Sequence, residues 1–189
     1  MLKTKKTLYR IILVFNLICI AAALCACVLT LVSAAANIWS RISSICALVA
    51  LVFAAFYILK GYGKDAARYF KLFALLFALS EFASLLVIGT TIKEGTPVLI
   101  SGVLFAIVLF MAIGLDVGKG RSLVLCAVVV AMAVAQLVLS IQHEPGVLLG
   151  GTTYGTLAML RNAVKVLLSC LFGIMVYAKY VDKKMRGTK

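Results

Sequence analysis

Six long apolar runs, separated by short segments that hold most of the charged residues, leave this chain few ways to fold. A bilayer core is spanned by about 20 apolar residues in a helix. The runs lie at about residues 9–34, 42–60, 70–90, 97–115, 122–141 and 158–180. Because helices satisfy every backbone polar group internally in lipid, the pattern predicts an all-α bundle of six transmembrane helices. We expect one transmembrane domain over residues 1–189, in the cell membrane.

Composition supports the same interpretation. Hydrophobic residues make up 65% of the chain, charged residues 13%, and the mean hydropathy is +1.16. These values lie outside the range of soluble globular domains. The first run follows a basic start, but it is longer than the ~7–15 apolar residues of a secretory signal peptide. We therefore interpret it as an uncleaved first membrane helix.

The basic residues predict how the helices are oriented. Of the 19 Lys and Arg residues, 15 fall in the N-terminal segment, the C-terminal segment and the two segments that follow the second and fourth runs. Positively charged segments stay in the cytoplasm, so both termini are expected there. The net charge of +13 then reflects contact with membrane lipid, and we expect no nucleic-acid partner.

Glu81 lies in the middle of the third run, where a carboxylate is costly and needs a partner. With a rise of 1.5 Å per residue, Glu81 lies about 16 Å from the cytoplasmic edge, Gln136 about 21 Å and Lys165 about 22 Å. These similar depths predict that the third, fifth and sixth helices turn polar faces inward, with Glu81 opposite Lys165. Asn16, at about 12 Å, could join this group from the first helix.

Two interpretations of these polar residues remain open. They could form a pocket in the outer half of the bundle, beneath the segment Gln142 to Thr156, with Arg161 and Asn162 beside it. The cations would then favour a small polar or anionic solute. Alternatively, Glu81 and Lys165 only neutralise each other and fix the packing of the helices, or Arg161 and Lys165 extend outward to the lipid headgroups.

The chain lacks the residues that several kinds of cofactor and metal chemistry require. His143 is the only histidine, so neither a haem held by two histidines nor a multi-histidine metal site can form within the chain. We expect no enzyme activity, no cofactor and no metal site. The six cysteines all lie in apolar runs and are interpreted as packing residues. Small residues four apart, such as Gly102 with Ala106 and Ala127 with Ala131, are expected to pack inside the bundle rather than to form an oligomer interface.

The start of the sixth run reads Asn162-x-x-Lys165. This looks like a pattern in the substrate-binding S components of energy-coupling-factor vitamin transporters, which are six-helix proteins of about this size with both termini inside. The resemblance covers a small part of the chain. It does not extend to the Pro- and Gly-rich middle helices of that family, because the only prolines are Pro97 and Pro145. It implies a transport subunit that works with another membrane or ATPase subunit.

The sequence therefore predicts a multi-pass membrane protein that binds a solute or is associated with transport. The predicted binding residues are Glu81, Gln136, Lys165, Asn16, Arg161 and Asn162. The alternative is a noncatalytic structural or regulatory membrane protein whose polar residues only set helix packing.

Overall fold

The computed structural model describes residues 2–33, 36–60, 66–91, 96–114, 120–143 and 153–186. These ranges hold six helices and no strand, which confirms the predicted all-α fold. The helices are α1 (Leu2–Val32), α2 (Ile38–Leu59), α3 (Ala66–Thr91), α4 (Thr96–Ile113), α5 (Gly120–His143) and α7 (Thr153–Arg186). Both end helices extend past the predicted spans, because charged residues continue each helix beyond its apolar part. The predicted segment Gln142 to Thr156 is helical at both of its ends, and residues 144–152 lie outside the described residues.

Five of the described helices are long and apolar enough to cross a membrane. Their candidate spans are Arg10–Val32, Ile38–Leu59, Ala66–Val87, Arg121–Leu139 and Thr156–Val181. The apolar part of α4, Leu99–Ile113, is shorter. The protein is thus a helical membrane protein, in which the described part of α4 is apolar but below the length required of a span.

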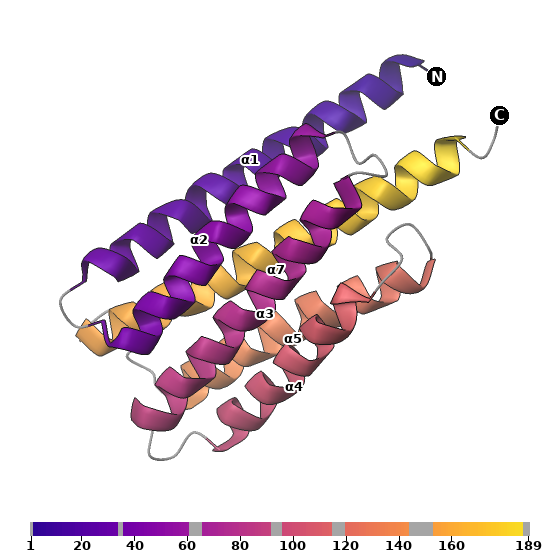
Figure 1. Cartoon of the computed structure of the whole chain (residues 1–189). Helices are drawn as coiled ribbons and strands as arrows, with labels where there is room; N and C mark the ends of the chain where they lie inside the picture. The colour runs from indigo at the N-terminus through magenta and orange to yellow at the C-terminus, as the bar shows by residue number, and fades with distance from the viewer. Residues whose placement is uncertain are drawn as a thin grey trace.

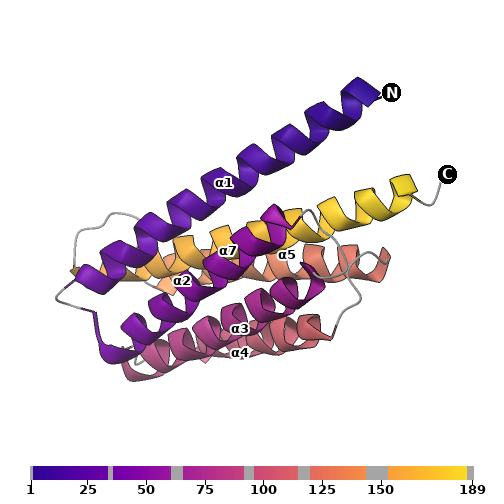
Figure 2. The same cartoon turned by 45° about the horizontal axis from the view of Figure 1, so that its top comes forward.

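Helices that follow one another in the sequence also pack against one another. Each described helix packs against the next one along the chain, and α7 closes the ring by packing on both α5 and α1 (Figures 1 and 2). In addition, α7 contacts α2 and α3 across the bundle. The N-terminal end of α1 and the C-terminal end of α7 lie at the same end of the bundle (Figure 1). We call this the terminal end and the opposite one the distal end.

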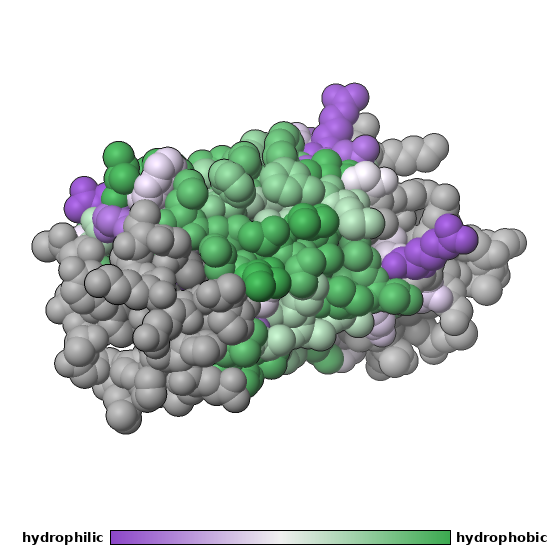
Figure 3. Space-filling model, turned by 90° about the horizontal axis from the view of Figure 1, so that it is seen from below, coloured by the Kyte–Doolittle hydropathy of each residue, from purple (hydrophilic) through white to green (hydrophobic). Residues whose placement is uncertain are grey.

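The lateral surface is apolar. Large side chains that a soluble protein would bury are at least half exposed, among them Phe15, Ile45, Phe82 and Met111. Figure 3 shows apolar residues gathered across the middle of one face, with hydrophilic residues toward its two ends. Such a continuous apolar surface is expected of a protein surrounded by lipid.

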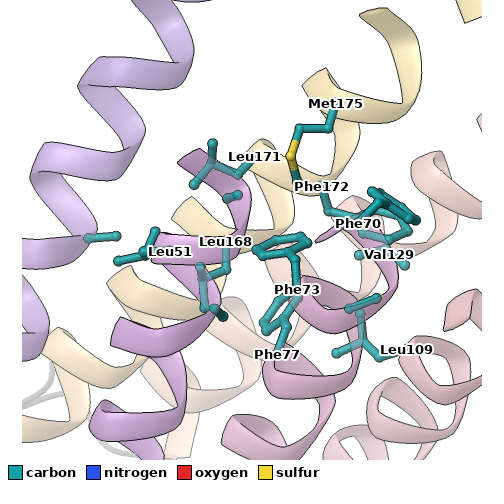
Figure 4. Close-up of a cluster of buried hydrophobic side chains, with 14 of the residues drawn as sticks. Leu51, Phe70, Phe73, Phe77, Leu109, Val129, Leu168, Leu171, Phe172 and Met175 are labelled. Atoms are coloured by element: carbon teal, nitrogen blue, oxygen red, sulfur yellow. The ribbon is translucent and has the colours of Figure 1, made fainter. Parts of the chain in front are cut away.

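Aromatic side chains fill the terminal half of the interior (Figure 4). Phe70, Phe73 and Phe77 follow one another along α3, with ring centroids 6.4 and 6.0 Å apart. Phe172 of α7 lies 5.4 Å from Phe70, and Phe105 of α4 meets Phe77 edge-on at 5.9 Å. All five rings have no exposed surface. The bundle is therefore densely packed on the terminal side of Glu81, which follows Phe77 by about one helical turn.

The two pairs of small residues differ in whether they face the bundle interior. Gly102 and Ala106 are buried, as expected, where α4 approaches its neighbours. Ala127 and Ala131 are exposed on α5, so the prediction that they pack inside the bundle is wrong. Spacing alone places two residues on one helical face, but it does not say which face turns inward.

Candidate functional site

A buried ion pair joins α3 to α7 in the interior of the bundle. The Nζ atom of Lys165 on α7 lies 2.7 Å from Oε2 of Glu81 on α3. The two residues are 2% and 4% exposed, so water is almost excluded from both charges. This confirms that Glu81 lies opposite Lys165. A buried pair of this kind holds two helices in one register, since each charge is costly without the other.

Gln136 extends the pair across the bundle. Lys165 also donates a hydrogen bond to Oε1 of Gln136 on α5. The Nε2 atom of Gln136 donates to Oγ of Ser101 on α4, at 3.4 Å. The Lys165 ammonium lies 5.6 Å from the centre of the Phe105 ring, within the range of a cation–π contact. Lys165 is therefore held by a carboxylate, an amide oxygen and an aromatic face from three different helices.

Gly102 makes this approach possible, because it leaves space on α4 facing the network. A Cβ atom at this position would lie 2.2 Å from Cδ2 of Leu85 and 3.0 Å from Nε2 of Gln136. The first distance is far below van der Waals contact. An added methyl group would thus have to displace Leu85, and it would also press on the amide group that contacts Ser101.

A small polar cavity lies on the other side of Glu81, in the distal half of the bundle. Its volume is about 20 Å³, which leaves room for about one water molecule. Four helices contribute to it. Its walls are Thr30, Ser40, Ser43, Ser44, Ser80, Glu81, Leu157, Arg161 and Val164.

Hydroxyl groups hold the α2 and α3 walls of this cavity together. Oγ of Ser43 donates to the backbone oxygen of Ser80, and Oγ of Ser80 donates to the backbone oxygen of Ser43, both at 2.9 Å. Thr30, on the α1 side, donates to its own helix at the Ala26 oxygen. The reciprocal serine bonds form a latch between α2 and α3, one residue away from Glu81.

The six predicted binding residues do not all come together in the structure. Glu81, Gln136 and Lys165 form the network, and Arg161, which is half-buried, lines the cavity together with Glu81. Asn16 is fully buried on α1, but its amide donates to the Ile12 oxygen of the same helix. We find no bond from Asn16 to the network in the described part of the chain. Depth along the helix was predicted, whereas the rotation of α1 that decides the contact was not.

Several buried polar side-chain atoms have no hydrogen-bond partner among the described residues, and Oδ1 of Asn16, Oγ of Ser84 and Nδ2 of Asn162 are among them. Ser84 lies about one turn from Glu81 along α3 toward the distal end, and Asn162 lies about one turn from Lys165 along α7 in the same direction. The distal side of the ion pair therefore retains unused hydrogen-bonding capacity. Asn162 is 3% exposed and does not line the cavity.

Sequence reasoning missed the hydroxyl-bearing wall of the cavity. Ser40, Ser43 and Ser44 lie three and four residues apart, so they share one face at the start of α2. Ser80 is directly next to Glu81. The spacing of the three serines on α2 was the signal that the sequence offered for this wall. It is a weak one, because Ser and Thr can bond to their own helix backbone anywhere in a membrane span.

The pocket was predicted to lie beneath the segment Gln142 to Thr156. The segment expected to cover it lies mostly outside the described residues. In the described part, no three His, Cys, Asp or Glu residues come together in a way that could hold a metal ion. The cysteines are free thiols. The site thus consists of one ion pair, one amide and a group of hydroxyls.

Comparison of the chain with protein-family models, curated proteins and solved structures gave no match. The resemblance at Asn162 and Lys165 to the vitamin-transporter subunits therefore has no support from overall similarity. The fold is that of an apolar helical membrane protein, and its function has to be argued from the site.

Proposed function

We propose that this protein binds a small polar solute in the distal half of its bundle, as a carrier or as the solute-binding subunit of a transport assembly. The observation that carries the proposal is a buried Glu81–Lys165 ion pair directly beside a hydroxyl-lined cavity. Ionisable residues inside a membrane are costly to keep, and they most often mark a solute or ion pathway.

The chemistry of the cavity favours a solute that can both accept and donate hydrogen bonds. Five hydroxyl-bearing residues line it, together with Arg161 and Glu81. A guanidinium binds carboxylate or phosphate oxygens well, because it presents several donors in one plane. An anionic or zwitterionic metabolite would place its negative group toward Arg161 and its hydroxyl or amino groups toward the serines.

The present cavity is that of a closed state. It has space for about one water molecule, so a larger solute requires the walls to separate. We expect them to separate at the Ser43–Ser80 latch, since its bonds join neutral hydroxyls to backbone carbonyl oxygens and can be exchanged for bonds to a solute. On the terminal side of Glu81, fully buried phenylalanines fill the interior among the described residues, so entry from the distal end is favoured.

The proposal includes six spans in the cell membrane, with both termini in the cytoplasm and the cavity opening outward. It is supported by the basic residues gathered at the terminal end and by the position of both chain ends there. Single cysteines at Thr96→Cys and Lys189→Cys, in a chain whose native cysteines are replaced by alanine, test this orientation. A membrane-impermeant maleimide added to intact cells should label the first and spare the second. The reverse labelling would contradict the orientation.

Solute binding can be tested on protein extracted gently from its native membrane. We expect mass spectrometry to recover a specific polar metabolite from the wild type, and less of it from Ser44→Ala and Arg161→Gln. Ser169→Ala is the matched control, because Ser169 is buried on α7 but its hydroxyl donates to its own helix at the Lys165 oxygen. An unchanged recovery in the cavity variants would refute this site. Any ATPase or second membrane subunit that co-purifies would identify a transport assembly.

A second function, a noncatalytic structural or regulatory membrane protein, is favoured by one specific observation. Lys165, Glu81 and Gln136 already satisfy one another, so fixing the packing of α3, α5 and α7 is a sufficient role for the network. This function predicts that the purified wild type carries lipid alone. It also predicts that replacing both charges with apolar residues leaves the physiological role of the protein intact.

A further inference from the structure

The helices α2 and α3 lie side by side and run in opposite directions (Figures 1 and 2). The Ser43–Ser80 latch fixes which of their residues face each other. Further toward the terminal end, the ring of Phe53 on α2 lies 6.4 Å from that of Tyr69 on α3, in the same register. Steps along one helix are therefore matched by nearly equal steps backward along the other. This register also places the residues on the distal side of the latch.

One helical turn beyond the latch, toward the distal end, the register brings Ser40 of α2 next to Ser84 of α3. Ser40 precedes Ser43 by three residues and Ser84 follows Ser80 by four, so each shares a helical face with its latch residue. Ser40 lines the cavity. Ser84 is 1% exposed, and its hydroxyl has no hydrogen-bond partner in the described part of the chain. The inner pair of serines is thus closed by hydrogen bonds, whereas the outer pair includes a buried hydroxyl that is unused.

The unused hydroxyl points to a second state of the bundle. Thr30 and Ser169 donate to the backbone of their own helices, which satisfies their hydroxyls within the membrane. Ser84 makes no such bond, and a buried polar group without a partner is costly. Its face of α3 lies between those of Ser80 and Glu81, which both line the cavity, although Ser84 itself is not a wall. Separation of α2 from α3 would join this hydroxyl to the cavity.

Two features give this outer position a preference for negative charge. Arg161 lines the same cavity as Ser40, and it precedes Lys165 on α7 by four residues, which places it level with Ser84 on the antiparallel α3. Ser40 is the third residue of α2, so the N-terminal end of that helix, with its partial positive charge, lies at the same level. Hydrogen bonds from hydroxyl groups to anionic oxygens are stronger than those between neutral groups.

We infer that the solute enters between α2 and α3, and that its anionic group binds at an outer subsite formed by Ser40, Ser84 and Arg161 when the Ser43–Ser80 latch opens. The group recognised is an oxyanion, such as a carboxylate, phosphate or sulfonate. The inference rests on the proposed function and adds to it an entry path, a further binding residue and the class of chemical group that is bound.

Cysteine labelling tests the path and the subsite, with small charged reagents as probes. The six native cysteines are replaced by alanine, and the protein is held in lipid nanodiscs, which leave both membrane faces open to the reagent. Ser84→Cys places a thiol at the subsite. Ala78→Cys is the matched control, because Ala78 is 0% exposed on the same helix but lies on the terminal side of Glu81. The probes are sulfonatoethyl methanethiosulfonate, an anion, and its trimethylammonium analogue, a cation.

Each labelling rate is divided by the rate of the same reagent with a free thiol in solution. We expect the anionic reagent to modify Ser84→Cys at least tenfold faster than Ala78→Cys, because only the distal half opens. At Ser84→Cys the anion should be favoured over the cation about fivefold, the factor that one opposite charge contributes at close range in water. Adding Arg161→Gln should remove this preference, whereas Arg41→Gln, an exposed charge at the distal end, should leave most of it.

Three labelling results would overturn the inference. Protection of Ser84→Cys to the same degree as Ala78→Cys would show that α2 and α3 do not separate there. Equally fast modification of both cysteines would show that the opening is not confined to the distal half. Equal corrected rates for the two reagents at Ser84→Cys would show a path without an anionic subsite.

A second variant separates recognition from structure. Ser84→Ala removes a hydroxyl that has no partner in this state, so its unfolding in detergent should show the stability of the wild type or more. It should retain about tenfold less of the polar metabolite that co-purifies with the wild type, since a hydrogen bond to a charged group is lost. Full retention by Ser84→Ala would overturn the subsite and leave the cavity in place. Lipid alone on the wild type would instead refute the proposed function and this inference with it.

Discussion

Removing one charge of the buried Glu81–Lys165 pair should destabilise the protein far more than removing both. At 2.7 Å, two unit charges attract each other by about 6 kcal/mol at an effective dielectric constant of about 20. Each charge has also lost several kcal/mol of hydration, so the net contribution of the pair is small. A single Lys165→Met or Glu81→Met substitution keeps one buried charge and loses its partner. We expect each to lower the free energy of unfolding by about 3–5 kcal/mol.

The double variant should lose no more than about 2 kcal/mol, mainly because Oε1 of Gln136 loses its donor. The coupling energy between the two positions is then at least about 4 kcal/mol. Unfolding in mixed detergent micelles with increasing dodecyl sulfate, followed by circular dichroism, measures all four proteins. Lys71→Met, an exposed charge on α3, is the control and should stay within about 0.5 kcal/mol of the wild type. Additive losses, or a Lys165→Met protein as stable as the wild type, would refute the buried pair.

Four further substitutions, with Gly114→Ala as a control, test the packing around the site by the same unfolding assay. Gly102→Ala should cost about 1–3 kcal/mol, because its methyl group overlaps a neighbouring side chain, whereas Gly114→Ala, whose nearest neighbour is at 3.7 Å, should cost almost nothing. Ser43→Ala and Ser80→Ala should each cost about 0.6 kcal/mol, and both together less than the sum, if the latch acts as one unit. Phe172→Ala should cost about 3–5 kcal/mol, since its ring is fully buried, and a loss below about 1 kcal/mol would contradict the packed aromatic interior.

The ion pair could be predicted from sequence because the membrane limits the possibilities. A charge in an apolar run must face the bundle interior, and the rise per residue fixes its depth. Glu81, Gln136 and Lys165 were predicted at similar depths on three helices, and the structure brings them together. The same reasoning failed for Asn16, because depth does not say which way a side chain turns, and this amide bonds to its own helix backbone.

The cavity was not predictable in the same way. Its hydroxyl groups are neutral and cost little in a membrane helix, so their positions are not constrained as charges are. Only the packing of α2 against α3 brings Ser43 and Ser80 together, and packing of that kind depends on helix rotation and crossing angle. The outward position of Ala127 and Ala131 has the same cause. The position of the network could be predicted from the charges of its residues, whereas the position of the cavity depends on how the helices pack.

The most direct test of solute binding uses the double variant Glu81→Met/Lys165→Met, which we expect to fold. Wild type and double variant are extracted gently from the native membrane in equal amounts, and the small molecules that each retains are compared by mass spectrometry. Solute binding predicts a specific polar metabolite on the wild type and its loss from the folded double variant. The same molecules on both proteins, or lipid alone on the wild type, would contradict the proposal and leave the ion pair as a packing element.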